Sequence, residues 1–504
     1  MYIVHIASEL APVAKVGGLG DVIHGLSKQQ QKNGDQVEII IPKYDILQYQ
    51  FIKNLSLETP DLWSFEDAFK YHNAVWSGIV DGLKTYFIEP HHNQYYFNRG
   101  AIYGCLNDIE RFLYFCRTTL EFLFTSEKKP DIIHVHDWPT ASIPILLKTI
   151  YEDLGFKYGA SVLTIHNLEH QGRCHPRSLT RIGLRGEDYR TPSQLQDPCE
   201  PTLLNLLQGG IVYADQVSTV SKKYSQEIKT PEFGFKLDPI IHKHQHKING
   251  ILNGIEINTW NPAKDSSLAE NYPSNPTYIE EILKRKKDNQ VALCKKLNIK
   301  KLKRPLLTCI TRIAKQKSPQ LIQRALHYAL ENDGSFILIG STHEKQIEKE
   351  FKHLQKVHES NPNIHIELEF NNDLAHLVFA AADAILVPSL YEPCGLTQMI
   401  AMRYGTVPIA RMTGGLADTV FDLDDLNIPT HQRTGFLFRL PTENHLDLVL
   451  ERAFNCYRNE KKRWSTLMQN GLSVDFSWKK SAHQYQLLYK TAIKSRKKSK
   501  SIAI

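Results

Sequence analysis

A glycine-rich segment directly after the first apolar run is the part of the sequence with the clearest chemical potential. Residues 15–21 read Lys-Val-Gly-Gly-Leu-Gly-Asp, and they stand between the apolar run Tyr2–Ser8 and a helical pattern. A strand-to-helix turn presents unpaired amide N–H groups at the positive end of the helix dipole. Gly17 and Gly18 let a phosphate or sugar approach the backbone, and Lys15 adds an ammonium group. The segment indicates a loop that binds an anion or a sugar, with a plain glycine-rich turn as the alternative.

The two best-known phosphate-binding loops do not fit this segment. A dinucleotide fingerprint needs a third glycine where Ile23 stands. The Walker loop ends in Gly-Lys-Ser/Thr, whereas Lys15 precedes the glycines.

Length and composition indicate an ordinary globular protein. The 504 residues are too many for one hydrophobic core and suit two domains. No apolar run approaches the roughly 18 residues needed to cross a bilayer, and the first strand pattern begins at residue 2, where a signal peptide would otherwise stand. The eight cysteines form no C-x-x-C pair, which is typical of reduced thiols. We therefore expect a cytoplasmic protein that does not contact a membrane.

The net charge of +7 does not indicate nucleic-acid binding, because of where the charge lies. Six basic residues and no acidic residue fall within 490–504, which leaves the rest of the chain close to neutral. A lysine-rich terminus is usually a solvated tail. We therefore expect no nucleic-acid partner.

Short apolar runs alternate with longer amphipathic segments along the chain, which is typical of parallel sheets covered by helices on both faces. The runs are 36–41, 132–136, 161–166, 306–310, 335–339, 384–387 and 407–410. The fold class that this predicts is α/β, with two doubly wound Rossmann-like domains and a deep cleft between them. Turn-rich sequence near 247–265 marks the boundary. We expect domains at 1–247 and 248–476, a helix at 477–495 that packs back on the first domain, and a basic tail at 496–504.

The residues with chemical potential follow the strand patterns, and ligands of such sheets bind at the carboxyl ends of the strands. In the first half, the Lys15 loop, His134-Val-His136-Asp137-Trp138 and His166-Asn167 each follow a run. In the second half, Arg312 and Lys317, the segment 391–396 and the segment 413–418 do the same. One carboxylate, two histidines and three cations that converge in this way favour a functional site over isolated structural residues.

These segments resemble, in order and over nearly the whole chain, the starch and glycogen synthase family of retaining glucosyltransferases with the GT-B fold, and in particular its bacterial members. The matching segments are Lys15–Val22, His134–Trp138, Thr164–Asn167, Gly250–Gly254, Thr311-Arg312 with Gln316-Lys317, Glu392–Gln398 and Thr413–Val420.

The resemblance implies transfer of glucose from a nucleotide sugar, in bacteria usually ADP-glucose, to the non-reducing end of an α-1,4-glucan such as glycogen. It implies catalytic roles for four residues. Glu392 is the carboxylate that stabilises the transition state, Arg312 and Lys317 neutralise the diphosphate, and His136 binds the transferred glucose. With these cations in place no metal is required, and the resemblance implies no cofactor.

The resemblance also implies a donor-binding set from both halves of the chain. Its members are Lys15, Gly17, Gly18, Asn167, Asn253, Cys394, Gly395, Leu396, Thr413 and Gly414. The run 394–396 is expected to start a helix whose free N–H groups hold sugar hydroxyls.

Three positions depart from the family pattern. Ser318 replaces a glycine beside Lys317, Asn98 replaces an acceptor-side carboxylate, and Ile400 replaces the second glutamate of the wider superfamily.

Three alternative functions stay open. They are a synthase that prefers UDP-glucose, another GT-B enzyme such as a sucrose-type synthase or a phosphorylase, and a non-catalytic glucan-binding protein. A phosphorylase would need a pyridoxal-lysine motif that the sequence does not show.

Overall fold

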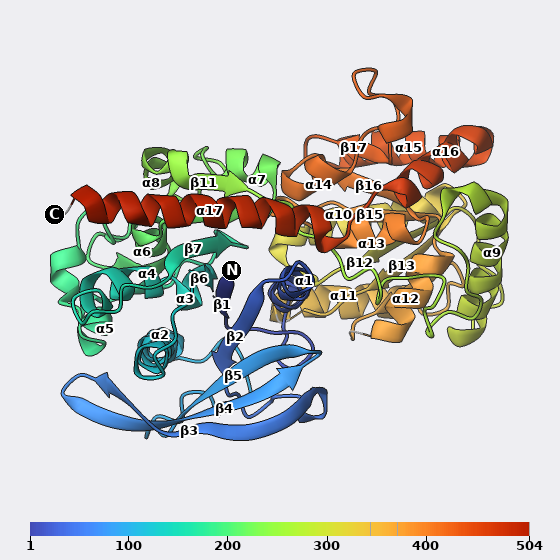
Figure 1. Ribbon diagram of the computed structural model, residues 1–504. Helices are drawn as coiled ribbons and strands as arrows, with labels where there is room; N and C mark the ends of the chain where they lie inside the picture. The colour runs from blue at the N-terminus through green and yellow to red at the C-terminus, as the bar shows by residue number, and fades with distance from the viewer. Residues whose placement is uncertain (343, 370, 503–504) are drawn as a thin grey trace. The chain divides into compact units, whose positions relative to one another are not determined.

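The computed structural model describes residues 1–342, 344–369 and 371–502, and it divides the chain into two compact units (Figure 1). Unit 1 contains Met1–Gly254 together with the chain from Trp478 onward, and unit 2 contains Ile255–Ser477. Each unit is built on its own sheet with helices packed against it. Within the described residues no helix is both long and apolar enough to cross a membrane.

Unit 1 contains a nine-stranded sheet in the order β11-β10-β7-β6-β1-β2-β5-β4-β3. The strands from β11 to β5 are mutually parallel. Their apolar residues are buried on both faces, as continuous apolar runs predict. The parallel strands are β1 (Tyr2–Ile6), β2 (Gln36–Pro42), β5 (Leu83–Pro90), β6 (Ile132–His136), β7 (Ala160–Ile165), β10 (Gln216–Thr219) and β11 (Ile248–Gly250).

An antiparallel extension at one edge of this sheet was not expected from the sequence. It consists of β3 (Ile52–Glu66) and β4 (Phe69–Val80), and β4 pairs with β5. Exposed residues predominate along β3, so the segment lacks the continuous apolar run by which we recognised the parallel strands. The sequence did carry one signal, because Asp81-Gly82 forms the two-residue turn between β4 and β5, with φ of 46° and 82°.

The helices of unit 1 begin with α1 (Gly18–Lys32) and end with α17 (Trp478–Ile502), and two short strands form a separate ribbon. The others are α2 (Asp108–Thr125), α3 (Asp137–Thr140), α4 (Ile143–Leu146), α5 (Pro176–Arg181), α6 (Leu206–Tyr213), α7 (Lys222–Glu227) and α8 (Asp238–Lys243); the ribbon is β8 (Arg173–Cys174) with β9 (Leu204–Asn205).

The last helix, α17, belongs to the core of the first unit although it comes after the second unit in the sequence (Figure 1). Its buried residues Trp478, Tyr485 and Tyr489 recur at helical spacing and share one hydrophobic cluster with Ile3 of β1 and Leu26 of α1. This cluster fixes the helix on the parallel part of the sheet.

Three of the expected boundaries were wrong. The first unit extends to Gly254 rather than residue 247, because β11 pairs with β10 and so completes the sheet of unit 1. The C-terminal helix starts at Trp478 and continues past residue 495 to Ile502. The prediction of a solvated tail at 496–504 was wrong for Arg496, because this residue is buried and forms an ion pair with Glu152 at 2.8 Å.

Unit 2 contains a six-stranded, fully parallel sheet in the order β14-β13-β12-β15-β16-β17. The strands are β12 (Leu306–Ile310), β13 (Ser335–Ile339), β14 (Ile364–Glu367), β15 (Ala384–Val387), β16 (Val407–Arg411) and β17 (Phe436–Phe438). The helices are α9 (Ile279–Lys296), α10 (Pro319–Glu331), α11 (Lys345–His358), α12 (Asn372–Ala381), α13 (Thr397–Arg403), α14 (Gly414–Thr419), α15 (Glu443–Asn459) and α16 (Lys461–Ser473).

Each sheet has a topological switch point, a pair of neighbouring strands whose connections run to opposite sides of the sheet. In unit 2 the chain moves outward from β12 to β14 and then returns to place β15 on the other side of β12. In unit 1 the same reversal falls between β1 and β6. Ligands of doubly wound sheets bind at the carboxyl ends of the strands at such points. The Lys15 loop follows β1, His136 is the last residue of β6, Arg312 and Lys317 follow β12, and Glu392 follows β15.

Candidate active site

The glycine loop after β1 is held by a buried carboxylate. Glu9 Oε2 accepts hydrogen bonds from the amides of Val16 at 2.7 Å and Gly17 at 3.0 Å, and Glu9 Oε1 accepts from the Tyr103 hydroxyl at 2.8 Å. These two loop amides are therefore engaged within the protein, contrary to the expectation that the amides of the turn are free for a ligand. Sequence reasoning missed Glu9, although it is an acidic residue that follows the first strand pattern. Glu9 fixes the loop that carries Lys15.

Lys15 itself is exposed and forms an ion pair with Asp21 at 2.8 Å, in the first turn of α1. A pair at this level of exposure contributes about 0–1 kcal/mol, so a ligand can displace it at little cost. The ammonium group of Lys15 is therefore accessible to a ligand, as is the backbone at Gly17 and Gly18, because all three residues are exposed.

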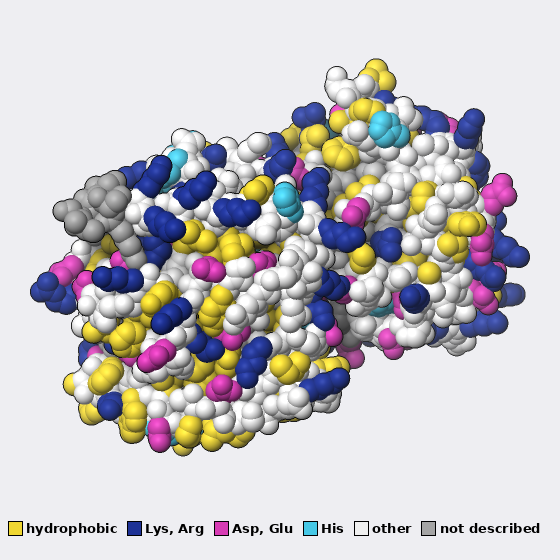
Figure 2. All heavy atoms as spheres, in the orientation of Figure 1, with side chains coloured by type: hydrophobic (Ala, Val, Ile, Leu, Met, Phe, Trp, Pro, Cys, Tyr) yellow, Lys and Arg dark blue, Asp and Glu magenta, His cyan; other side chains and the backbone are white. Residues whose placement is uncertain are grey.

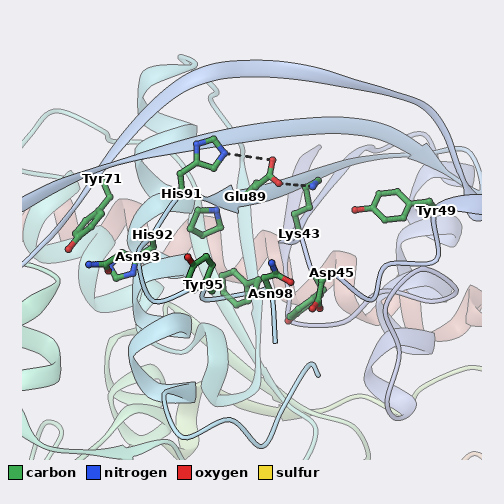
Figure 3. Close-up of a pocket in the computed structure, with 13 residues that line it drawn as sticks. Lys43, Asp45, Tyr49, Tyr71, Glu89, His91, His92, Asn93, Tyr95 and Asn98 are labelled. Atoms are coloured by element: carbon green, nitrogen blue, oxygen red, sulfur yellow. Dashed lines mark hydrogen bonds and ion pairs between the residues drawn. The ribbon is translucent and has the colours of Figure 1, made fainter. Parts of the chain in front are cut away.

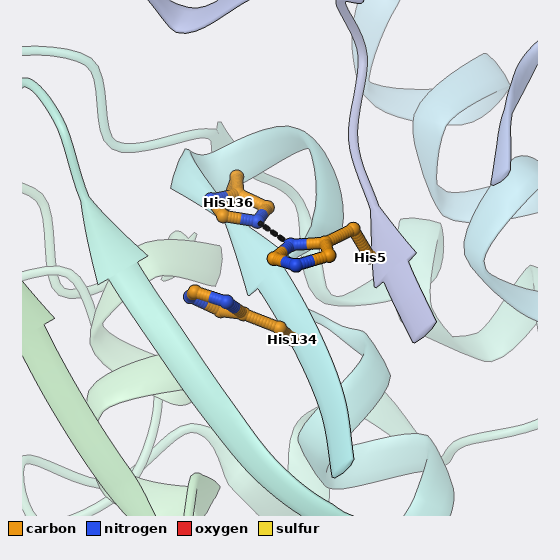
Figure 4. A group of neighbouring side chains, drawn as sticks. All are labelled: His5, His134 and His136. Atoms are coloured by element: carbon orange, nitrogen blue, oxygen red, sulfur yellow. Dashed lines mark hydrogen bonds between the residues drawn. The ribbon is translucent and has the colours of Figure 1, made fainter. Parts of the chain in front are cut away.

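A chain of hydrogen-bonded histidines lies at the β1–β6 switch point (Figure 4). His136 Nδ1 is 3.1 Å from His166 Nε2, and His136 Nε2 is 3.1 Å from His5 Nδ1. The chain ends at Gln30, whose Oε1 is 2.8 Å from His5 Nε2. Burial lowers the pKa of His5 to about 4 and that of His166 to about 3, and it lowers the pKa of His136 well below the usual value. All three rings are therefore neutral at pH 7.

The orientation of Gln30 determines which nitrogen of each ring carries the proton. Gln30 Nε2 donates to the Tyr489 hydroxyl at 2.9 Å, so its carbonyl oxygen faces His5 and accepts from His5 Nε2–H. A neutral ring has one donor and one acceptor, so His136 Nε2–H donates to His5, and His166 Nε2–H donates to His136. His166 is half-buried, and its Nδ1 is the acceptor at the outer end of the chain.

This arrangement bears on the expected role of His136 as a glucose-binding residue. Both of its ring nitrogens are hydrogen-bonded to other histidines, and the residue is fully buried. The contact of His136 with glucose stays a prediction. For a direct contact the His136 ring must rearrange; otherwise His166 contacts the glucose and His136 acts by holding His166.

Two of these histidines, His5 and His136, form a compact group with His134. Among the residues that the structure describes, it is the one group of His, Cys, Asp or Glu side chains that could surround a metal ion. The ligand atoms of His5, His134 and His136 lie within 4.8 Å of one another (Figure 4). His134 is itself bonded to the Tyr489 hydroxyl at 2.8 Å and to Thr164 Oγ1 at 2.6 Å. A metal ion would have to displace several of these hydrogen bonds, so the geometry favours a hydrogen-bonded network.

Two further polar residues of unit 1 follow the ends of its strands: Asp137 after β6 and Asn253 after β11. Asp137 has a left-handed backbone, with φ of 55°, and its Oδ1 accepts from the amides of His166 at 2.7 Å and Asn167 at 3.3 Å. Burial raises the pKa of Asp137 to about 7. Strained backbone conformations of this kind concentrate at functional sites. Asn253, predicted to bind the donor, is buried, and its Oδ1 has no hydrogen-bond partner among the described residues. An unsatisfied buried acceptor is costly without a ligand or water.

At the β12–β15 switch point of unit 2, Lys317 Nζ forms an ion pair with Glu392 Oε2, which also accepts from Ser389 Oγ at 2.7 Å. The structure thus brings together the predicted carboxylate and one of the predicted cations. Glu392 is buried, and Lys317 is half-buried. Arg312 is exposed, and within the described parts of the chain its guanidinium forms no ion pair or hydrogen bond. A ligand can therefore reach Arg312 directly.

Two further polar residues hold the loops that carry this ion pair. Gln316 Nε2 donates to the Tyr391 carbonyl at 2.9 Å, and the Leu390 amide donates to the Gln316 carbonyl at 2.8 Å. Arg411 at the end of β16 donates to the carbonyl of Leu390. These bonds clamp the loop after β12 to the loop after β15, which sets Lys317 beside Glu392. Sequence reasoning gave neither Gln316 nor Arg411 a positioning role.

The glycines at 414 and 415 allow close backbone contact behind Glu392. The Gly415 amide donates to the Glu392 carbonyl at 3.0 Å. A Cβ atom at Gly414 would lie 2.0 Å from the Glu392 carbonyl oxygen, and one at Gly415 would lie 1.9 Å from that of Cys394. The Thr413-Gly-Gly segment therefore supports the loop of Glu392. Its predicted contact with the donor stays a prediction.

We expected the segment Cys394–Leu396 to start a helix, and this prediction was wrong, because α13 begins at Thr397. Gly395 has φ of 72°, and its carbonyl accepts from Gln398 Nε2 at 2.7 Å. The segment is therefore a tight turn that leads into a short helix.

Ser318 occupies a backbone conformation that explains the family pattern. It has φ of 54° and ψ of 69°, in the left-handed region that favours glycine. The resemblance places a glycine here, next to Lys317. The serine keeps the same turn at a cost in backbone strain.

Two α/β units, each with polar residues at the switch point of a parallel sheet, define a glycosyltransferase of the GT-B class. Residues 2–243 match the family model of the starch synthase catalytic domain, and residues 294–467 match that of glycosyl transferases group 1. The chain belongs to the starch and glycogen synthase family, which confirms the fold class and the family expected from the sequence motifs.

Relatives cover nearly the whole chain. A glycogen synthase of Protochlamydia amoebophila is 45% identical over 97% of this chain and 99% of its own. The glycogen synthase 2 of Methylococcus capsulatus is 42% identical over 96% of this chain and 99% of its own. The solved catalytic domain of starch synthase IV from Arabidopsis thaliana, bound to ADP and acarbose, is 43% identical and superimposes with a TM-score of 0.93 over 98% of this chain and 99% of that chain.

Proposed function

We propose that this chain transfers glucose from ADP-glucose to the non-reducing end of an α-1,4-glucan, with retention of the α configuration and without a metal ion or cofactor. The nucleotide is proposed because the similar starch synthase IV domain was solved with ADP. The proposal includes action on glycogen in the cytoplasm, in keeping with relatives named glycogen synthase.

The observation that carries the proposal is the Lys317–Glu392 ion pair, together with the accessible Arg312, which follows the same strand as Lys317. Transfer breaks the bond between C1 of glucose and a diphosphate oxygen, so negative charge develops on the diphosphate and positive charge on C1. The acceptor hydroxyl oxygen bonds to C1, and its proton leaves with the diphosphate. Lys317 and Arg312 match the first charge, and the carboxylate of Glu392 matches the second. Preorganised charges of this kind supply a large share of enzymatic rate enhancement.

Unit 1 supplies groups suited to the neutral and anionic parts of the donor. Lys15 is exposed on a fixed loop, and Asn253 presents an unsatisfied buried oxygen. The histidine chain that contains His136 ends in an acceptor nitrogen on His166, beside Asn167. We assign these residues to binding of the donor and its glucose.

The direct test is an assay of purified protein with glycogen and either ADP-glucose or UDP-glucose. Incorporation of glucose into polymer with at least a tenfold higher kcat/KM for ADP-glucose supports the proposal, and a preference for UDP-glucose overturns the nucleotide assignment. Release of glucose 1-phosphate from glycogen and phosphate would indicate a phosphorylase instead. Anomeric proton signals of the extended product distinguish α from β linkage.

A further inference from the structure

Gln30 ends the buried histidine chain of unit 1, and its side-chain amide is held from both sides. Gln30 Oε1 is 2.8 Å from His5 Nε2, and Gln30 Nε2 donates to the Tyr489 hydroxyl at 2.9 Å. Figure 2 shows lysine and arginine side chains over the outer face of α17, whereas Tyr489 is buried in the hydrophobic cluster that this helix shares with Leu26 of α1. The packing of α1 against α17 therefore fixes the position of the amide.

Another buried histidine of unit 1 has a different partner, a carboxylate. His92 lies in the wall of a cavity of about 590 Å³ (Figure 3), and its Nε2 is 2.7 Å from Glu66 Oε2. A carboxylate beside an imidazole attracts a second proton to the ring. Gln30 instead gives His5 a neutral acceptor, and burial lowers the pKa of His5 to about 4. Gln30 therefore fixes where the His5 proton lies without placing a charge on the chain.

The orientation of the Gln30 amide is transmitted along the chain from ring to ring. Because His5 carries its proton on Nε2, its Nδ1 accepts from His136 Nε2–H at 3.1 Å. His136 Nδ1 is then the acceptor for His166 Nε2–H, also at 3.1 Å. A turned amide would reverse each of these bonds, and Nδ1 of His166 would change from an acceptor to a donor. One side-chain amide thus determines the outer nitrogen of a ring two histidines away.

The hydroxyl of Tyr489 keeps the amide of Gln30 from turning. This hydroxyl accepts from Gln30 and therefore donates its own proton to His134 Nδ1 at 2.8 Å, and His134 Nε2 donates to Thr164 Oγ1 at 2.6 Å. If the amide turned alone, its Nε2–H would face the proton of His5, and its oxygen would face the oxygen of Tyr489. Both contacts are repulsive, so Gln30 can turn only if every ring in the network changes its tautomer.

We propose that Gln30 is a positioning residue of the transfer reaction, which sets the tautomer of His166 through the two rings between them. His166 Nδ1 then accepts a hydrogen bond from a hydroxyl group of the transferred glucose. The proposal rests on the proposed function, which assigns His166 and Asn167 to the donor and its glucose. Asn167 Oδ1 accepts from the Glu169 amide at 3.1 Å, which leaves its Nδ2 as a donor to sugar hydroxyls. With the reversed tautomer of His166, both side chains would be donors, and the hydroxyl proton would have no acceptor.

The test combines histidine NMR with kinetics of the full chain. In Gln30→Met the side chain fills a similar space but loses both hydrogen bonds, and Gln31→Met makes the same change at an exposed position of α1. Nitrogen-15 shifts of labelled histidines distinguish protonated from unprotonated ring nitrogens, and His166→Gln identifies the His166 signals. We expect His166 to carry its proton on Nε2 in the wild type and to be a mixture of tautomers in Gln30→Met. The kcat/KM for ADP-glucose should fall at least fivefold in Gln30→Met and stay within twofold in Gln31→Met.

Gln30→Glu separates the placement of the protons from support of the fold. The carboxylate accepts from His5 Nε2–H as the amide does, but it favours a charged His5 ring as the pH falls. A charged His5 donates from both nitrogens, so His136 must accept from it, and the tautomer of His166 reverses. The described side chains that face His5 are neutral at pH 7; besides Gln30 they are His134 and His136 of β6, with Tyr489 of α17 behind them. Relative to wild type at the same pH, kcat/KM for ADP-glucose should be within twofold at pH 8.5 and at least fivefold lower at pH 6.

Failure of this inference is distinguishable from failure of the proposed function, because the NMR measurement does not require transfer. An unchanged His166 tautomer in Gln30→Met overturns the inference, and so does a folded Gln30→Met with wild-type kcat/KM. A Gln30→Glu variant whose His5 is charged at pH 6 but whose kcat/KM still equals that of wild type also overturns it. The expected change of tautomer in a protein that transfers no glucose supports the control of His166 by Gln30 and overturns the proposed function.

Discussion

The hydroxyl of Tyr489 lies 2.8 Å from Nδ1 of His134, although the two residues are 355 positions apart in the sequence. The same hydroxyl accepts from Gln30 Nε2 at 2.9 Å. One residue of the C-terminal helix α17 therefore holds both His134 and the glutamine that orients the histidine chain. The helix joins the core of unit 1 and also fixes polar groups at its switch point.

Replacing Tyr489 by phenylalanine tests this relationship. The change leaves two buried polar groups without their shared partner, so we expect a loss of about 1–3 kcal/mol in the free energy of unfolding, measured by urea denaturation. Leu487→Ala is the control, because Leu487 lies on the same helix and is exposed. Equal stability of Tyr489→Phe and wild type would show that the hydroxyl is dispensable.

The buried histidines predict a loss of stability in acid. His5, His134, His136 and His166 are neutral in the folded chain because burial lowers their pKa values, to about 4 for His5 and about 3 for His166. In the unfolded chain they take up protons near pH 6.5. The unfolded state therefore binds more protons below pH 6.5, and the free energy of unfolding falls as the pH drops from about 6.5 to about 4.

Urea denaturation at pH 7.5, 6 and 5 measures this slope. Each histidine contributes up to about 1.4 kcal/mol per pH unit, so His5→Gln should flatten the slope by up to that amount. His431→Gln, at an exposed position, should leave the slope unchanged. An identical slope in His5→Gln and wild type would contradict the neutral histidine chain.

Glu392→Gln tests the carboxylate in catalysis. The amide keeps an acceptor for Ser389 and loses the charge that stabilises C1, so kcat should fall by a factor of 100 or more with little change in the KM for the nucleotide sugar. Glu443→Gln, an exposed glutamate of the same unit, is the control. A variant that retains more than a tenth of wild-type kcat, a loss below ~1.4 kcal/mol, would remove Glu392 from the mechanism.

Gly415→Ala tests whether the loop contact behind Glu392 positions the carboxylate. The new Cβ would lie 1.9 Å from the Cys394 carbonyl oxygen, so the loop must move. We expect kcat to fall at least tenfold while the KM for glycogen stays near wild type, because the change is confined to the loop that carries Glu392. Thermal unfolding shows whether the variant is folded. A folded variant with wild-type kcat would mean that the close contact does not position Glu392.

Metal independence is the prediction that follows from the cations. The proposed function assigns neutralisation of the diphosphate to Lys317, Arg312 and Lys15, so transfer should continue in excess EDTA at no less than half the rate without it. Loss of activity that returns on addition of Mg²⁺ would mean that these side chains are not sufficient to neutralise the leaving group. Activity restored only by Zn²⁺ would direct attention to the histidines of Figure 4.

The parallel strands and the polar residues that follow them could be predicted from the amino-acid sequence. Runs such as 132–136, 306–310 and 384–387 coincide with β6, β12 and β15, because a strand buried on both faces must be apolar throughout. The pairing of Lys317 with Glu392, 75 positions apart, is a consequence of the switch point, although the sequence only predicted that the two would converge.

Two features became visible only in the folded chain: which polar groups are already hydrogen-bonded within the protein, and that the C-terminal helix packs on unit 1. Glu9 accepts hydrogen bonds from two amides of the glycine loop, and both ring nitrogens of His136 are hydrogen-bonded, to His5 and His166. The sequence did not show these bonds, because each partner comes from a different strand or loop. The exposed strand β3 and the buried Arg496 were missed for the same physical reason. The burial and pairing of these residues depend on neighbours that are distant in the sequence, so a local pattern of apolar and polar residues cannot predict them.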